Sequence, residues 1–327
     1  MINGILNIYK KPGFTSHDVV AKLRGIVRQK KIGHTGTLDP DAEGVLPVCL
    51  GKATRLCGLL TEESKTYEAV LLLGVSTDTQ DTSGQVLSRR PVTCSEAEVI
   101  RCLEGFLGPQ MQIPPMYSAL KRDGKKLYEL ARQGVEVARE PRPVHFYEIT
   151  VLETALPRIT FRVSCSRGTY IRTLCHDAGE KLGCGGCMER LVRTRVGNFV
   201  RERAYTLEQV ENLVREGRLS ECLLPVDGVF AELPAFSVLP EGDAAAHNGN
   251  PLDAELLVPG TGGEKKPVCG SSPETGERQP ESADACRMAW AEQFRLYDSD
   301  GTFVGLYGWA GRAARPVKMF YDGPQGQ

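Results

Sequence analysis

The 327-residue chain contains no long hydrophobic run, and none of its segments approaches the ~20 consecutive apolar residues that a membrane-spanning helix needs. Its first residues also lack the basic stretch followed by an apolar one that marks a secretion signal. Strong compositional bias is missing too, because 41% of the residues are hydrophobic and 25% are charged. These absences exclude a fibre or a wholly disordered chain. They predict a cytoplasmic globular protein of about two domains.

An excess of charge of one sign is absent from the whole chain, since 40 Lys and Arg side chains balance 41 Asp and Glu at a net charge of −1. The two parts of the chain differ, however. Residues 231–327 carry 8 basic and 14 acidic side chains, whereas residues 1–230 carry 32 basic and 27 acidic ones. We therefore expect a phosphate-rich ligand to bind the first part.

A disulfide framework is not expected either. The eleven cysteines are an odd number and lie scattered through helix-like and strand-like segments, which is typical of buried thiols in a reducing compartment. Cys184 and Cys187 are the one close pair, and neither a second pair nor a histidine stands at the spacing of a zinc site. We predict that the protein binds no metal.

The hydrophobic periodicity indicates both helices and strands, without a regular strand–helix–strand rhythm, and this favours an α+β fold around a mixed sheet. Helical patterns cover residues 15–31, 51–63, 95–106 and 169–182; strand patterns cover 65–75, 144–154 and 159–165; residues 33–51 read as a structured loop and 77–84 as a turn after which 85–87 return as a hairpin partner.

The last third of the chain predicts a small β-rich domain that contains an insertion. Of the 28 residues at 258–285, 16 are Gly, Pro, Ser or Glu, a composition that buries too little apolar surface to offset its ordering entropy. Apolar runs at 252–257 and 294–307 flank this segment, and the second contains a turn at 298–301. We expect residues 258–285 to be a mobile insertion.

The densest group of chemically useful residues follows the first helix. Glycines at 33, 36 and 44 let a ligand approach the backbone, and Pro40 holds the chain extended directly after Asp39. A connector whose acidic side chains face water is the alternative. The segment is no P-loop, because no Gly stands five residues before Gly51, and no calcium loop, because Leu50 replaces the required Glu. A phosphoaspartate site is only weakly possible, since no apolar strand precedes it.

Three blocks in this region carry a resemblance: HTGTLDP at 34–40, GVLP at 44–47 and GKATR at 51–55. Together they resemble the signature of the bacterial tRNA pseudouridine-55 synthase family (TruB). Further blocks agree in the family's order, so the resemblance extends over residues 2–230. They are KKPG at 10–13, KTY at 65–67, IPPMYSALK at 113–121, CSRGTYIR at 165–172 and LVRTR at 191–195.

The resemblance implies a cofactor-free isomerase that converts the T-loop uridine at tRNA position 55 to pseudouridine. On this reading Asp39 is the nucleophile, a role that suits a carboxylate ionised at neutral pH. Whether it attacks the sugar, attacks the base or first removes a ribose proton stays open. Tyr67 would stack on the extruded base and help to remove its C5 proton, and Arg172 would pair with Asp39.

The resemblance also implies an RNA-binding surface. His34 would fill the place of the flipped base by stacking, and Tyr170 and Leu191 would line the pocket. Cations expected to contact the tRNA are Lys10, Lys11, Arg55, Lys121, Arg122, Lys125, Lys126, Arg132 and Arg142.

The expected architecture is a pseudouridine synthase domain at 1–230, with a mixed, largely antiparallel sheet flanked by helices and a tRNA-clasping insertion at about 106–149. A small PUA-like domain follows at 231–327. We expect a monomer that needs tRNA but no protein partner and no membrane. The alternatives are a guide-RNA-dependent relative and a tRNA-folding chaperone whose main role is binding.

Overall fold

Two compact units make up the computed structural model, Met1–Leu223 and Leu224–Gln327, against an expected boundary at 230/231. The structure describes residues 1–122, 124–260, 293–321 and 323. Most of the expected insertion at 258–285 lies outside these residues. Its first two residues, Val258 and Pro259, were wrongly included, because they belong to strand β17 (Leu257–Pro259).

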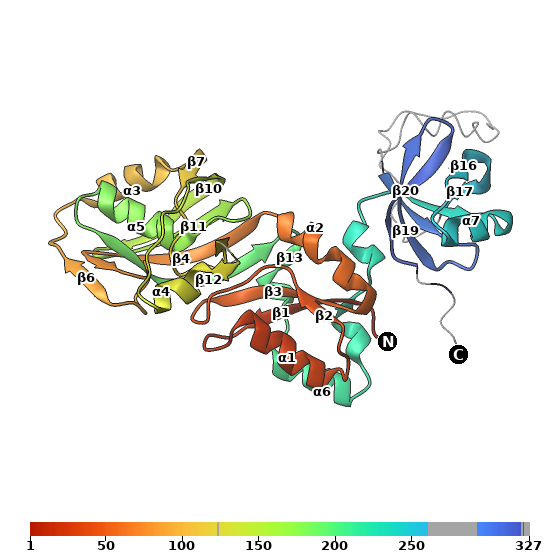
Figure 1. Cartoon of the computed structure of the whole chain (residues 1–327), viewed down its shortest axis with the longest axis horizontal. Helices are drawn as coiled ribbons and strands as arrows, with labels where there is room; N and C mark the ends of the chain where they lie inside the picture. Colours follow the sequence, from red (N-terminus) through yellow and green to blue (C-terminus); the bar gives the residue numbers. More distant parts are fainter. Residues whose placement is uncertain (123, 261–292, 322, 324–327) are drawn as a thin grey trace, which may run out of the picture. The chain divides into compact units, whose positions relative to one another are not determined.

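A ten-stranded mixed sheet is the centre of the first unit (Figure 1). Its main path runs β14-β1-β3-β12-β4-β11-β10-β7, with β2 beside β3 and β13 beside β12. Strand β12 is parallel to β3, whereas the pairs β1–β3, β4–β12, β4–β11, β10–β11 and β7–β10 are antiparallel. This confirms the predicted mixed, largely antiparallel sheet. The bounds are β1 Gly4–Lys10, β2 Ile32–His34, β3 Glu43–Leu50, β4 Lys65–Leu73, β7 Gly108–Gln112, β10 Arg142–Ala155, β11 Arg158–Cys165, β12 Gly186–Val196, β13 Phe199–Val200 and β14 Leu223–Leu224.

Helices cover two separate parts of this sheet and enclose two hydrophobic cores. Helices α3 (Glu96–Glu104) and α5 (Ile171–Lys181) pack on the part formed by β4, β10, β11 and β12. Helices α1 (Ser16–Ile26) and α6 (Leu207–Arg215) pack on β1, β2 and β3. The smaller elements are the 3-10 turn η1 Gly51–Leu56, α2 Cys57–Glu62, α4 Leu127–Arg132 and the strand pairs β5 Val75–Thr77 with β6 Val86–Arg89 and β8 Lys121–Arg122 with β9 Lys125–Lys126. None of the helices in the described part is long and apolar enough to span a bilayer.

Helix α1 begins where the sequence predicts it. The Thr15 side chain accepts a hydrogen bond from the backbone N–H of Asp18, and the Asp18 carboxylate accepts one from the Thr15 backbone. This reciprocal capping satisfies two donors at the start of the helix. Val19 and Leu23 are buried on the face that packs against the sheet, so the same short segment determines both where the helix starts and which face it buries.

The interpretation of residues 33–51 as a loop was wrong over most of its length. Residues 43–50 form the fully sheet-paired strand β3, and residues 32–34 form β2 beside it. A strand buried on both faces reads as a continuous apolar run without alternation, and Pro47 argues against a central strand. The expected hairpin partner at 85–87 also differs, because β6 pairs with β5 and not with β4.

Gly44 permits the parallel contact between β3 and β12. Its φ is +111°, and a Cβ there would lie 2.2 Å from the carbonyl oxygen of Arg193. Gly44→Ala should therefore lower the free energy of unfolding by about 3–5 kcal/mol, as for other strained, overpacked positions. Urea denaturation measures this change. Gly58→Ala is the matched control, since a Cβ at this position in α2 meets nothing within 4 Å; it should cost nothing. Equal stability of the two variants would contradict the close-approach argument.

The second unit is β-rich, as predicted. Its six-stranded sheet has the order β16-β20-β19-β18-β15-β17, and its core includes Phe236, Phe294 and Tyr307. The expected turn at 298–301 joins β18 to β19, where the N–H of Gly301 donates to the carbonyl of Asp298 at 3.0 Å. The bounds are β15 Ala235–Val238, β16 Leu252–Asp253, β18 Gln293–Tyr297, β19 Phe303–Ala310 and β20 Ala313–Met319, with helix α7 at Asp243–His247. Its resemblance to PUA domains stays a prediction.

Candidate active site

Asp39 lies in the short connection between β2 and β3, and this connection is fixed from two sides. The backbone N–H of Leu38 donates to the Ser16 hydroxyl at 2.9 Å, at the start of α1. On the other side, the Lys10 ammonium donates to the carbonyls of Pro40 at 2.9 Å and Ala42 at 2.5 Å. Backbone contacts before and after Asp39 therefore hold its carboxylate in one place.

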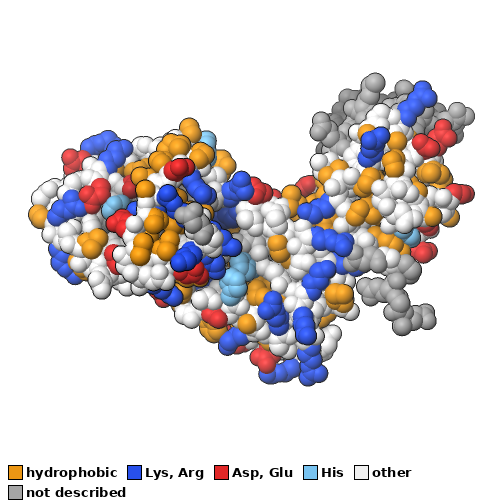
Figure 2. Space-filling model, in the orientation of Figure 1, with side chains coloured by type: hydrophobic (Ala, Val, Ile, Leu, Met, Phe, Trp, Pro, Cys, Tyr) orange, Lys and Arg blue, Asp and Glu red, His pale blue; other side chains and the backbone are white. Residues whose placement is uncertain are grey.

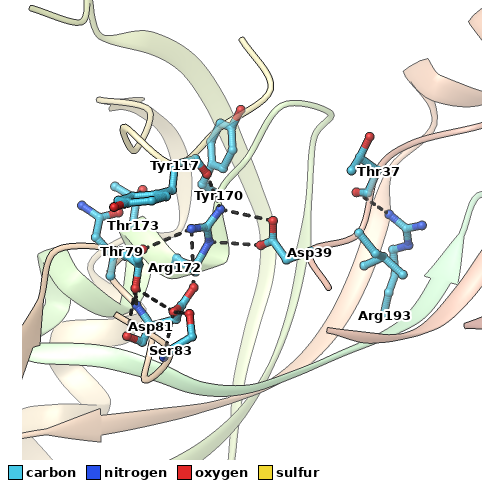
Figure 3. Close-up of polar contacts among 12 residues, drawn as sticks. Thr37, Asp39, Thr79, Asp81, Ser83, Tyr117, Tyr170, Arg172, Thr173 and Arg193 are labelled. Atoms are coloured by element: carbon cyan, nitrogen blue, oxygen red, sulfur yellow. Dashed lines mark hydrogen bonds and ion pairs between the residues drawn. The ribbon is translucent and has the colours of Figure 1, made fainter. Parts of the chain in front are cut away.

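The Arg172 guanidinium holds the Asp39 carboxylate with two nitrogens (Figure 3). Nε lies 3.1 Å from Oδ2, and Nη2 donates to Oδ1 at 3.3 Å. Arg172 is 4% exposed and comes from the first turn of α5. A two-point contact of this kind fixes the orientation of a carboxylate as well as its position.

Arg172 is itself held by residues that the sequence did not single out. Nη1 donates to the carbonyl of Thr79 at 3.1 Å and Nη2 to the carbonyl of Tyr117 at 2.9 Å. The Asp81 carboxylate lies 3.5 Å from Nη1 as a second anionic partner (Figure 3). Asp81 belongs to the segment that we interpreted only as a turn, residues 77–84. Its Oδ1 also accepts from the hydroxyl of Thr79 at 2.7 Å, so the turn is a rigid support.

The start of α5 is positioned by a buried glutamine from β7. The Gln112 side chain accepts from the backbone N–H of Tyr170 at 2.8 Å and donates to its carbonyl at 3.0 Å. Gln112 is 5% exposed. Tyr170 precedes the helix, so this double contact fixes the end from which Arg172 reaches Asp39. No local sequence signal marks Gln112, because its partner is 58 residues away.

Burial and the nearby cations shift the pKa of Asp39 in opposite directions. Although the Asp39 side chain keeps 41% of its surface exposed, the protein packed around it raises its pKa above the ordinary value, while Arg172 and Lys10 lower it. The net direction is upward. The arginine limits the increase and aims the carboxylate.

Tyr67 lies on β4 directly opposite Arg193 on β12. Burial raises the pKa of Tyr67 to about 12, and the Arg193 cation acts against that rise. Arg193 is 2% exposed. It also donates to the carbonyls of Val45 at 2.7 Å and Gly36 at 3.2 Å. The buried cation of Arg193 thus lies beside the tyrosine and contacts the backbone both before and after Asp39. The sequence analysis did not identify this residue.

Lys10 does not belong to the set of tRNA contacts, although the sequence predicted it there. It is 1% exposed, and its ammonium donates to the backbone carbonyls of Lys11 and, directly after Asp39, of Pro40 and Ala42. Burial lowers its pKa to about 8, although the nearby Asp39 and Asp41 carboxylates oppose this. A side chain buried to this extent positions the loop and has no surface with which to meet a phosphate.

His34 ends β2 and stands beside a second histidine that the sequence analysis did not use. Its ring lies 5.4 Å from that of His17 at an angle of 79°. The His34 Nδ1 accepts from the backbone N–H of Gly36 at 3.3 Å, so any ring proton sits on Nε2. Burial and the nearby His17 and Arg193 lower the pKa of His34. These effects favour the neutral form of the ring.

The two expected pocket residues lie near this group. Tyr170 lies two residues before Arg172, and burial raises the pKa of its hydroxyl. Leu191 is buried and belongs to the same hydrophobic cluster as Tyr67 and Leu38. Tyr67 of β4 and Leu191 of β12 thus pack in one cluster with Leu38, the residue before Asp39.

The expected cations around 121–142 are exposed, apart from the half-buried Lys126. Lys121 and Lys125 stand on the β8–β9 hairpin. Arg122 donates to the carbonyl of Ala138 inside the same segment. Lys126 and Arg132 lie over the ring of Tyr128. Arg142, at the end of this segment, is exposed. Outside it, Lys11 pairs with Glu208 at 2.9 Å, and Arg55 is exposed.

The cysteines and acidic residues show no metal-site geometry in the described ranges, where no three His, Cys, Asp or Glu side chains are grouped as ligands. Cys184 and Cys187 are buried free thiols, like most of the nine cysteines in that part.

Family models match two consecutive parts of the chain. "TruB family pseudouridylate synthase (N terminal domain)" covers residues 24–171, and "tRNA pseudouridylate synthase B C-terminal domain" covers residues 172–231. The curated tRNA pseudouridine synthase B of Lachnoclostridium phytofermentans is 46% identical over 98% of this chain and 100% of its own length. That of Bacillus velezensis is 43% identical over 77% and 84%.

Two solved structures are similar over nearly the whole chain. An H/ACA ribonucleoprotein bound to a substrate RNA containing 2'-deoxyuridine gives a TM-score of 0.65 at 25% identity, covering 98% of this chain and 85% of that one. A Cbf5–Nop10–Gar1 complex gives 0.66 at 27% identity, covering 97% and 84%. The fold and the Asp39–Arg172 site, with these matches, define the class of the pseudouridine synthases. Within that class the chain belongs to the TruB family.

Proposed function

We propose that the protein is a tRNA pseudouridine synthase that acts on the T-loop uridine at position 55, with Asp39 as the nucleophile. In this isomerisation the bond between the ribose and N1 of uracil breaks, the base turns, and C5 is joined to the ribose. The C5 proton is lost and N1 gains one, so no atoms enter or leave. The curated relatives named tRNA pseudouridine synthase B support the substrate class.

The observation that carries the proposal is the two-point contact between Asp39 and the buried Arg172. The pair supplies a carboxylate that is aimed and ionised without a metal or a separate base. The side chain of Asp39 remains 41% exposed, so a nucleotide can reach it. A carboxylate used only for stability would gain nothing from this exposure.

Tyr67 has a second role in the proposal. At a pKa of about 12 its hydroxyl keeps its proton at neutral pH. Accepting the C5 proton requires the phenolate, and the nearby Arg193 cation stabilises that form. The ring itself forms an apolar wall for the flipped base, together with Leu191.

Base flipping costs a few kcal/mol of lost stacking, and His34 is placed to offset it. The half-buried, neutral ring at the end of β2 offers a stacking face worth about 1–3 kcal/mol. The ring of His17 packs edge-on against the ring of His34. The proposal therefore assigns binding to His34 and chemistry to Asp39.

The decisive experiment is incubation of the purified protein with an unmodified tRNA transcript, without guide RNA, protein partners or added metal. Mapping of modified uridines should show pseudouridine at position 55 alone. Conversion only after addition of guide RNA and partner proteins would favour the guide-dependent relative, whose complexes share the fold. Tight binding without conversion would favour a tRNA-folding chaperone.

The proposal includes a monomeric enzyme in the cytoplasm, with tRNA as its partner and no cofactor. Free thiols at all nine described cysteines support a reducing compartment. The β-rich second unit, which we propose to be PUA-like, is not needed for the chemistry assigned to Asp39.

Binding of tRNA should depend on the β8–β9 hairpin. Lys121→Gln/Lys125→Gln removes two exposed cations, so the slope of log Kd against log salt should become shallower by about 0.7–0.9 per cation. Filter binding between 50 and 300 mM salt measures the slope. Arg158→Gln/Lys181→Gln, with the same charge change on β11 and α5, is the control. A slope equal to that of the control would remove the hairpin from the interface.

A further inference from the structure

A second group of cations lies on the first unit, outside the 121–142 segment. Residues 19–34 and 44–61 contain seven Lys and Arg and no Asp or Glu. Four of these seven are exposed at the end of α1 and in the turn that leads to β2. We call them the α1–β2 basic surface; its residues are Arg24, Arg28, Lys30 and Lys31.

The local backbone holds these four side chains together. The Arg24 Nε donates to the carbonyl of Lys30 at 3.2 Å, and the N–H of Gln29 donates to the carbonyl of Arg24 at 3.2 Å. The N–H of Gly51 donates to the carbonyl of Lys31 at 2.9 Å, which joins the turn to η1. These contacts fold the turn back on the helix and hold its basic residues in defined positions.

Carboxylates of α6 lie near two neighbouring cations, Lys11 and Lys22. Lys11 pairs with Glu208 at 2.9 Å, and Lys22 lines a small cavity together with Glu208 and Glu211 of α6. Across the described ranges no ion pair joins any member of the α1–β2 basic surface to a carboxylate. A concentrated, uncompensated positive surface attracts polyanions. Figure 2 shows Lys and Arg side chains over the part of the first unit that carries α1, with few acidic ones between them.

The position of the surface relative to the site identifies its partner. Helix α1 starts at Ser16, which contacts the residue before Asp39, and its eleven residues extend about 16 Å to the basic end. Strand β2 leads from Lys31 to His34 in three residues, about 10 Å. The 121–142 segment is joined to the site by another route: the N–H of Tyr128 donates to the carbonyl of Ser118 at 3.1 Å, and the neighbouring Tyr117 carbonyl accepts from Arg172. Both basic groups are therefore joined to the Asp39–Arg172 site through short stretches of backbone.

We propose that the α1–β2 basic surface binds the phosphate backbone of the RNA stem that carries the target nucleotide. This inference rests on the proposed function and adds a second contact area to it. Phosphate contacts fix register and orientation without reading sequence. The surface therefore contributes to affinity and leaves the chemical step unchanged.

The test is Arg24→Gln/Arg28→Gln/Lys30→Gln/Lys31→Gln, assayed for binding of an unmodified tRNA transcript from 50 to 300 mM salt. We expect a Kd at least 10-fold higher at 100 mM salt and a salt slope shallower by about 3. The single-turnover rate at saturating tRNA should remain within twofold of wild type. The control is Arg89→Gln/Arg101→Gln/Arg158→Gln/Lys181→Gln, which changes the net charge equally on the surface around α3, α5 and β6.

Equal Kd and slope for the two variants would overturn the proposal, since only total charge would then matter. If the quadruple variant unfolds, as judged by circular dichroism, Lys30→Gln/Lys31→Gln replaces it, against Arg89→Gln/Arg101→Gln. That pair keeps the backbone carbonyl contacts of the turn. The proposed function can fail separately: a wild-type protein that binds tRNA through this surface without forming pseudouridine would refute the activity and keep the surface.

Discussion

Asp39→Asn should abolish pseudouridine formation, lowering the single-turnover rate by roughly 10⁴-fold or more, while tRNA binding is kept. Asparagine has the shape of aspartate and can still meet the Arg172 guanidinium with its amide oxygen. It lacks the negative charge that makes the carboxylate a nucleophile. Removal of one negative charge from an RNA-binding site should leave Kd unchanged or slightly lower. Rapid-quench assays with tritium-labelled tRNA measure the rate, and filter binding measures Kd.

Asp41→Asn is the matched control for this change. Asp41 lies two residues further along the same connection, is exposed, and undergoes the same change of charge. Its rate should remain within a few-fold of wild type. Comparable losses in the two variants, or turnover by Asp39→Asn near the wild-type rate, would end the assignment of Asp39 as the nucleophile.

Arg172→Lys should lower the rate by about 10²–10³-fold, with a smaller effect on Kd. Lysine keeps the positive charge but has one nitrogen, so it cannot hold both oxygens of Asp39 and also the carbonyls of Thr79 and Tyr117. The carboxylate then loses its fixed direction. Arg162→Lys, an exposed residue paired with Glu68 on the sheet, is the control and should retain full activity.

The same variant should change the pH dependence in a defined direction. Burial raises the pKa of Asp39 and Arg172 opposes that rise, so a weaker contact lets the pKa rise further. Activity needs the ionised carboxylate and is lost as the pH falls through this pKa. The acidic limb of the kcat/KM profile should therefore move to higher pH in Arg172→Lys. A limb that stays in place or moves to lower pH would contradict the role of Arg172 in keeping Asp39 ionised.

The sequence by itself determined the family, the candidate nucleophile and many of the local elements. Capping signals and apolar spacing are local, so Thr15 and the spacing of Val19 and Leu23 sufficed to place α1. The order of motif blocks identified Asp39, Tyr67 and Arg172 because each motif is contiguous in the chain. Strand β3 was missed for a physical reason: buried on both faces, it has no alternation, and its glycine and proline resemble a loop.

Only the tertiary structure decided which residues support the catalytic ones. Asp81 reaches Arg172 from a turn 91 positions earlier in the chain, and Arg193 meets Gly36 and Val45 across the parallel pairing of β12 with β3. Lys10, which local context presents as an RNA-binding cation, is buried under the Asp39 connection. Long-range pairing brings these groups together, and burial then determines whether a charge meets solvent or backbone. Neither property is encoded in a short stretch of sequence, because both depend on which distant strands become neighbours.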